Sequence, residues 1–127
     1  MPRVPDKVSL PAAFATFSEH WSPRIAADLN GQQVKLAKFK GAFDWHSHER
    51  EDELFLVHRG SFVMEFREGD GVTRVPVAQG EMLVVPRGVE HRPVAEEEVE
   101  VVLFEPASTV NTGNVRSERT VTELKRV

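Results

Sequence analysis

The chain contains no cysteine, and this absence removes two classes of site at once. Disulfides cannot form, and thiolates cannot hold a metal ion, so any metal site has to use histidine and carboxylate side chains. With 127 residues, 40% of them apolar, the chain is long enough to bury one core without covalent cross-links. We therefore expect a single globular domain.

The chain also has no excess of positive charge, with 16 lysines and arginines against 20 aspartates and glutamates. The formal net charge is −4, and the basic residues are scattered except for Lys125-Arg126, a pattern that gives no attraction for nucleic acid. No apolar run approaches the length of a membrane span. An Ala-Phe-Ala sequence at 13–15 imitates a signal-peptidase site, but the apolar stretch before it is short and contains two prolines and an aspartate. We expect a cytoplasmic protein that binds neither nucleic acid nor a membrane.

The N-terminal segment has the pattern of one short helix or helical turn within residues 9–21. Ser9 is a suitable N-cap, and three aromatic side chains recur at helical spacing and would face one way. These are Phe14, Phe17 and Trp21. We expect this stripe to pack on the body of the protein.

The remainder is typical of short strands separated by turns. Asn30-Gly31 is a strong hairpin signal, and the acidic run Glu96-Glu97-Glu98 is interpreted as a solvated turn. Expected strands cover residues 24–29, 32–40, 53–58, 61–67, 72–77, 82–85, 91–95 and 99–105. Such a series predicts a β-sandwich or barrel. Within the single domain 1–127 we expect a helical arm (1–23), a barrel (24–105) and an extended tail packed partly on it (106–127).

The stretch WHSHEREDE, residues 45–53, concentrates titratable groups. His46 and His48 are two apart, so on a strand they face the same side, and converging neutral imidazoles suggest a divalent metal. A return strand beginning at Glu53 could add a carboxylate to the site. The alternative is a charged, solvated turn.

Four carboxylates compete for that role. Glu49 and Glu51 belong to the turn and are expected to face solvent, whereas Asp52 and Glu53 begin the next strand on opposite faces. Glu53 shares its face with apolar residues. Strand parity separates the faces without selecting one carboxylate.

Two other histidines are assigned structural roles. His58 lies on the strand face opposite Glu53 and about 17 Å along an extended chain from it, so we expect an exposed residue. His20 would sit at the end of the N-terminal helix, where a cation is favoured by the helix dipole. His91 follows a Pro-x-Gly turn and opens a strand; it joins a site only if the fold brings it to the first two histidines.

Two segments resemble the paired motifs of the cupin superfamily. Residues 41–60 resemble the pattern G-x5-H-x-H-x3-4-E-x6-G, with one residue missing between Gly41 and His46. Residues 80–91 match G-x5-P-x-G-x2-H throughout, although Ala95 stands where the family often has asparagine. The short segment between the motifs is similar to that of small bacterial cupins. The whole chain also resembles small cupins described as mannose-6-phosphate-isomerase-like, a label of relationship rather than of activity.

The resemblance implies an all-β, double-stranded β-helix (jelly-roll) barrel with His46, His48, Glu53 and His91 as metal ligands. Three histidines and one carboxylate would leave one or two coordination positions open for a ligand. The expected cofactor is one divalent ion, and iron, manganese, zinc, nickel and cobalt all suit these ligands.

The function stays open at this level. A metal-dependent isomerase, oxygenase or lyase acting on a small polar compound, such as a sugar or a carbonyl or carboxylate compound, is one hypothesis. A non-catalytic sensor or binding module is the alternative, and a structural role with an incidental metal is the third. An apolar stripe (Phe62, Met64 and Phe66) could line a pocket, although core packing is commoner, and Arg92 should face outward. We also expect a homodimer that covers the edge of the 24–40 hairpin.

Overall fold

The computed structural model describes residues 4–127, so the first three residues of the expected arm lie outside it. Its elements are the helix α1 (Leu10–Phe14) and the strands β1 (Arg24–Leu29), β2 (Gln32–Ala42), β3 (Glu53–Arg59), β4 (Ser61–Glu68), β5 (Gly71–Ala78), β6 (Met82–Val85), β7 (His91–Pro106) and β8 (Lys125–Arg126). No helix within this described range is long and apolar enough to cross a membrane.

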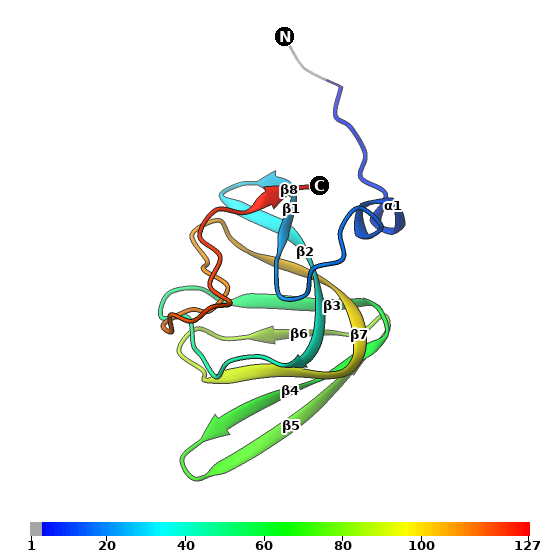
Figure 1. Cartoon of the computed structure of the whole chain (residues 1–127). Coiled ribbons are helices and arrows are strands. Elements are labelled where there is room, and N and C mark those ends of the chain that lie inside the picture. The colour runs from blue at the N-terminus through cyan, green and yellow to red at the C-terminus, as the bar shows by residue number, and fades with distance from the viewer. Residues whose placement is uncertain (1–3) are drawn as a thin grey trace.

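The strands wrap into a barrel because β7 is long enough to contact three partners. Its first residues pair with β4, and its later residues pair with β2 on one edge and β3 on the other. The strand order is β5-β4-β7-β2-β1-β8, and β6 joins through β3. Figure 1 shows these strands stacked around a common interior, which confirms the predicted jelly-roll barrel.

The two faces of β2 explain its imperfect alternation. Ala37 and Phe39 point into the barrel core, while Leu36 is fully buried on the outside beneath Phe14 of α1. Burying a side chain of this size stabilises the fold by about 1.5–3 kcal/mol. Because both faces of the strand are covered, its sequence cannot show the clean alternation of a half-exposed strand.

The aromatic stripe of the N-terminal segment is divided between two cores. The expected short helix is present with Ser9 as its N-cap, but it ends at Phe14, and the chain reaches Trp21 without helical geometry. Trp21 enters the barrel core and stacks on Phe39 and Phe43 with ring centroids 4.6 Å apart in both cases. The three aromatic residues therefore do not share one helix face as expected, because Phe14 and Phe17 pack in one core and Trp21 packs in the other.

The acidic run near the end of the barrel is also not a turn. Residues 96–98 are exposed but continue β7 without interruption, so the two expected strands are one. The run contains no glycine or proline to break the strand, and three solvated carboxylates are compatible with an exposed strand segment.

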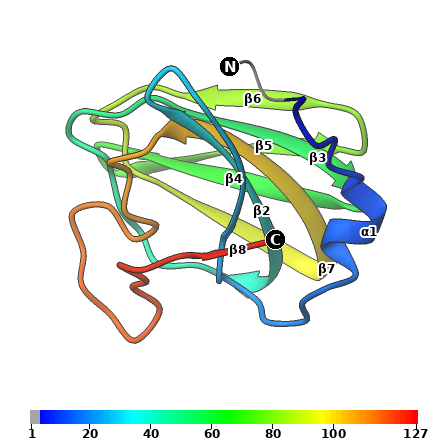
Figure 2. The same cartoon turned by 90° about the horizontal axis from the view of Figure 1, so that it is seen from above.

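The C-terminal segment is more ordered than an extended tail. After β7 it forms a series of turns, and β8 then pairs in parallel with the start of β1. Figure 2 shows the orange part of this segment on the side of the barrel opposite α1, and the red part with β8 runs back toward the middle of the view. The segment thus lies beside the loop between β2 and β3, which carries the histidine pair.

Candidate metal centre

Three different parts of the barrel supply the four predicted ligands. His46 and His48 lie in the connection between β2 and β3, Glu53 is the first residue of β3, and His91 is the first residue of β7. Two backbone hydrogen bonds of 3.1 and 2.9 Å pair His46 with His91. All four side chains are buried, with relative exposures between 0% and 3%.

The functional atoms of these side chains converge. One ligand atom from each residue lies within 4.8 Å of every other. Oε1 of Glu53 lies 3.2 Å from Nε2 of His48 and 3.5 Å from Nε2 of His91. Among residues 4–127, Nε2 of both histidines and Oε1 of Glu53 are buried and have no hydrogen-bond partner of acceptable geometry. Buried polar atoms rarely remain unsatisfied, so this donor set fits a bound cation.

Backbone carbonyls orient two of the imidazoles. His46 Nδ1 donates to the Asp44 carbonyl at 2.9 Å, and His91 Nδ1 donates to the Val89 carbonyl at 2.8 Å. Each bond places the proton on Nδ1 and leaves the lone pair of Nε2 facing the cluster. The same arrangement is usual for histidines that bind metals.

The electrostatics of the cluster favour the metal-binding protonation states. Burial, assisted by the nearby His91, lowers the pKa of His46 from 6.5 to about 4. Burial acts to raise the pKa of Glu53, but the adjacent imidazoles of His48 and His91 outweigh it and hold that pKa well below its usual range. At neutral pH the imidazole of His46 is therefore neutral, and the carboxylate of Glu53 is ionised.

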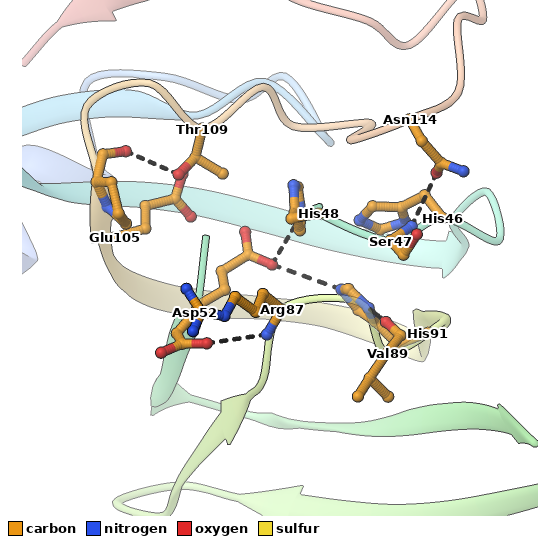
Figure 3. Close-up of polar contacts among 12 residues, drawn as sticks. His46, Ser47, His48, Asp52, Arg87, Val89, His91, Glu105, Thr109 and Asn114 are labelled. Atoms are coloured by element: carbon orange, nitrogen blue, oxygen red, sulfur yellow. Dashed lines mark hydrogen bonds and ion pairs between the residues drawn. The ribbon is translucent and has the colours of Figure 1, made fainter. Parts of the chain in front are cut away.

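The C-terminal segment holds the histidine pair from outside. Asn114 N–H donates to the Ser47 carbonyl at 3.0 Å, and the Ser47 N–H donates to Oδ1 of Asn114 at 2.9 Å (Figure 3). Gly113 has φ of +55°, and a Cβ there would lie 2.2 Å from the Ser47 carbonyl oxygen. Only glycine allows this close approach next to His46.

A second contact from the same segment supports His46 through Asp44. The carboxylate of Asp44 accepts hydrogen bonds from Arg119 at 2.9 Å and from the Ser117 hydroxyl at 2.6 Å. The carbonyl of Asp44 is the acceptor for His46 Nδ1. The residues after β7 thus fix the backbone on both sides of this imidazole.

A cavity of about 40 Å³ adjoins the ligands His46 and Glu53. Aromatic and aliphatic side chains form most of its wall, but a buried ion pair joins them: Lys35 Nζ lies 2.6 Å from Oε2 of Glu105. Burial and the charge of Glu53 raise the pKa of Glu105 well above its usual range, while Lys35 opposes the rise.

The carboxylates other than Glu53 lie outside the cluster. Asp52 accepts from the Arg87 backbone N–H at 2.9 Å, Glu51 accepts from the Ser108 hydroxyl at 2.8 Å, and Glu49 is exposed. These three carboxylates therefore lie at the surface turn and do not reach the buried ligand cluster.

The remaining histidines and Arg92 also lie outside the cluster. His58 is half-buried rather than exposed, because it bonds to Glu100 at 3.0 Å and stacks on Phe14. His20 contacts Glu98 at 2.7 Å and does not end a helix, so the dipole argument was wrong for it. Arg92 faces outward and binds Glu65 at 2.7 Å.

Sequence reasoning missed the supporting residues. The run Asn111-Thr112-Gly113-Asn114 signals a turn, but nothing local connects it to Ser47. Lys35 was the better signal, since a lysine between Val34 and Leu36 in an apolar strand indicates a buried charge that needs a partner.

The comparisons with known proteins agree with the fold. Residues 30–105 match the model of the family described as Cupin domain. A cupin-2 domain containing protein from Shewanella frigidimarina is 40% identical, with a TM-score of 0.73 over 78% of this chain and 93% of that one. Protein NMB1881 from Neisseria meningitidis is 31% identical, with a TM-score of 0.72 over 80% of this chain and 100% of that one.

Among curated proteins, the uncharacterized protein YdbB of Bacillus subtilis is 33% identical over 66 residues. The match spans 52% of this chain and 56% of that protein. These relatives do not assign a reaction, but the family match covers the barrel and all four converging side chains. The chain belongs to the cupin family.

Proposed function

We propose that this cupin binds one divalent metal ion through His46, His48, Glu53 and His91, and that the metal binds a small carbonyl or carboxylate compound from the adjoining cavity. One observation carries the proposal: four buried ligand atoms converge within 4.8 Å, and three of them have no hydrogen-bond partner in the described part of the chain. A cluster of this kind is costly to bury unless something pairs with it.

A bound divalent ion would supply Lewis-acid activation or, for a redox-active metal, electron transfer. The protein residues define the rest. His46 and His91 are held in one tautomer by backbone carbonyls, and Glu53 contributes one negative charge. The aromatic wall of the cavity excludes water from the ligand that reaches the site.

The shape and lining of the cavity support a small ligand. Trp21, Phe39, Phe43 and Phe55 line it, and they offer few partners for the many hydroxyl groups of a sugar. A compact carbonyl or carboxylate compound, with one end on the metal, suits these walls better. An isomerase or an oxygenase would be compatible with such a site.

Elemental analysis of protein purified without chelator or nickel resin tests the metal. We expect about one equivalent of a divalent ion per chain, and none in His48→Ala. His58→Ala is the matched control, because it removes a histidine that pairs with Glu100 outside the cluster. Metal-free wild-type protein that also fails to take up zinc, manganese or iron would refute the proposal.

A non-catalytic sensor or binding module is the second candidate. It is favoured because Lys35 and Glu105, the titratable groups beside the ligands, are paired with each other instead of being poised as a free base. A turnover screen of metal-loaded protein decides between the two. If a ligand binds at the metal but is not converted in the presence of any co-substrate tested, the enzyme function is refuted and the sensor or binding module remains.

We also propose a homodimer. In the described part of the chain, β8 covers only Arg24 and Ile25 of β1, so the rest of that edge lacks a strand partner. Exposed edges are commonly covered by a second copy. Light scattering should give twice the 14.3 kDa mass of the chain at micromolar concentration, and a stable monomer would refute this proposal.

A further inference from the structure

The ion pair between Lys35 and Glu105 is buried inside the barrel rather than on its surface. The two residues are each 2% exposed, and the charged atoms lie 2.6 Å apart. Removing two charges from water costs several kcal/mol per ion, and apolar replacements of similar size are often as stable or more stable. Stability alone therefore does not account for this pair beside the metal ligands.

Both members of the pair have hydrogen-bonding capacity left. Lys35 Nζ has three donors, of which two are used by Glu105 and by the Thr109 carbonyl at 3.3 Å. Within residues 4–127, Oε1 of Glu105 is buried without a hydrogen-bond partner. Both side chains line the cavity, and the ligands His46 and Glu53 line the same cavity.

A hydroxyl group matches these two atoms. It can accept from the ammonium of Lys35 while it donates to the carboxylate of Glu105. It can also accept from Glu105 when that carboxyl group carries a proton, so the match does not depend on the protonation state.

The charge balance calls for an anion, and this step rests on the proposed function. A divalent ion bound by three imidazoles and one ionised carboxylate would leave one net positive charge in the barrel. The Lys35–Glu105 pair leaves this charge unchanged when both are ionised, and Lys35 increases it when Glu105 carries a proton. A buried net charge is costly, so a monoanionic ligand on the metal is favoured.

The size of the cavity restricts that anion. A cavity needs about 10–15 Å³ to hold one water molecule. The cavity of about 40 Å³ beside Glu53 therefore admits only a few non-hydrogen atoms. The charged end of this anion would bind at the coordination positions that the four protein ligands leave open on the ion. Since the walls are mostly apolar, the part between the two polar ends must be a short carbon chain.

We propose that this site takes a two- or three-carbon hydroxy acid, whose carboxylate binds the metal and whose hydroxyl group binds Lys35 and Glu105. In this arrangement Lys35 and Glu105 determine specificity: they distinguish a hydroxy acid from the acid that lacks the hydroxyl group.

Glycolate and acetate form a matched pair of probes, because they differ only in the hydroxyl group. Titration calorimetry on zinc-loaded wild-type protein should show that glycolate binds roughly tenfold more tightly than acetate or better, the value of one good bond to a charged partner. Trp45→Phe leaves Trp21 as the sole tryptophan of the two. Because Trp21 lines the cavity, glycolate should change its fluorescence.

The double variant Lys35→Met/Glu105→Leu removes the pair without leaving either charge alone. It should bind zinc stoichiometrically and bind glycolate and acetate with equal affinity. Lys38→Met is the control: this buried lysine donates at 2.7 Å to the Phe17 carbonyl and does not line the cavity, so the glycolate preference should persist.

The outcomes separate this inference from the proposed function. Failure of the wild-type protein to bind zinc refutes the metal site itself. Stoichiometric zinc with no preference for glycolate over acetate overturns the hydroxy-acid inference alone, and this comparison needs no variant to fold. Persistence of the preference in a folded double variant also overturns it.

Discussion

His91 and Arg92 are neighbours on β7, yet they belong to two opposite kinds of polar cluster. Arg92 lies on the outer face, where it binds Oε1 of Glu65 at 2.7 Å while Arg74 binds Oε2 at 2.8 Å. Its guanidinium also lies 4.8 Å from the ring centre of Trp45. Both oxygens of the outer carboxylate have a cationic partner, and the cluster is complete as it stands.

The inner cluster around His91 has the opposite character. Nε2 of His91 and His48 and Oε1 of Glu53 are deeply buried, yet they lack hydrogen-bond partners in the described chain. A satisfied outer cluster contributes to stability, whereas an unsatisfied inner one costs stability until something binds. The comparison predicts that changes to the inner cluster or to its supporting contacts affect metal binding, and that changes to the outer cluster around Arg92 affect only the free energy of unfolding.

His48→Ala should give the largest effect. Loss of one of four ligands should lower metal affinity roughly a thousandfold, about 4 kcal/mol. The metal-free variant should unfold at nearly the wild-type urea concentration, because the lost imidazole nitrogen had no partner there. Competition with a chromophoric chelator measures the affinity, and urea titration in excess chelator measures the stability. Equal loss of both quantities would mean that the inner cluster is structural.

Acid should destabilise the metal-free protein through His46. Its pKa is about 4 when folded and 6.5 when exposed, so the unfolded chain binds more protons between these values. The stability is thus full above about pH 6.5 and falls by about 3 kcal/mol as the pH drops toward 4. Urea midpoints in excess chelator at several pH values measure this slope. His46→Gln should flatten it, and an unchanged slope in that variant would contradict the assignment.

Gly113→Ala tests how the C-terminal segment supports the inner cluster. The added Cβ would meet the Ser47 carbonyl at 2.2 Å, which forces the backbone between the two histidines to move. Because changes in the support of metal ligands typically cost about 10- to 100-fold in affinity, we expect a loss in that range. Gly69→Ala is the control, since it has a similar φ of +57° and open space around it. Equal metal affinity in both variants would show that the segment does not position the ligands.

Short-range patterns predicted the strands of the barrel and the shared direction of His46 and His48, whereas the cupin resemblance was needed to select Glu53 and His91. The spacing of His46, His48 and Glu53 is set by strand parity and one turn. His91 required the register of β7 against the histidine pair, a long-range property that only the resemblance supplied. The separation of Trp21 from the helix was missed because its packing in the barrel core is a tertiary contact. The continuous β7 was missed because the exposed acidic run 96–98 was interpreted as a turn although it contains no glycine or proline.

The supporting contacts of the site could not be predicted for the same reason. Gly113 and Asn114 act on Ser47, and Glu105 pairs with Lys35, across distances along the chain that no periodicity describes. What the sequence did contain was each feature in isolation: a glycine in a polar turn and a charge in an apolar strand. Their partners become evident only when the barrel has closed.

Glu65→Gln should give the smallest effect and complete the comparison. The change weakens two ion pairs whose arginines are 64% and 32% exposed at the side chain, so solvent screening limits the loss of stability to about 1 kcal/mol. The loss should shrink further in about 1 M salt, since the pairs are accessible to ions. Urea midpoints at low and high salt measure it, and chelator competition should give unchanged metal affinity. A fall in metal affinity here would show that the outer cluster also positions His91 through β7, and the two faces would then not be independent.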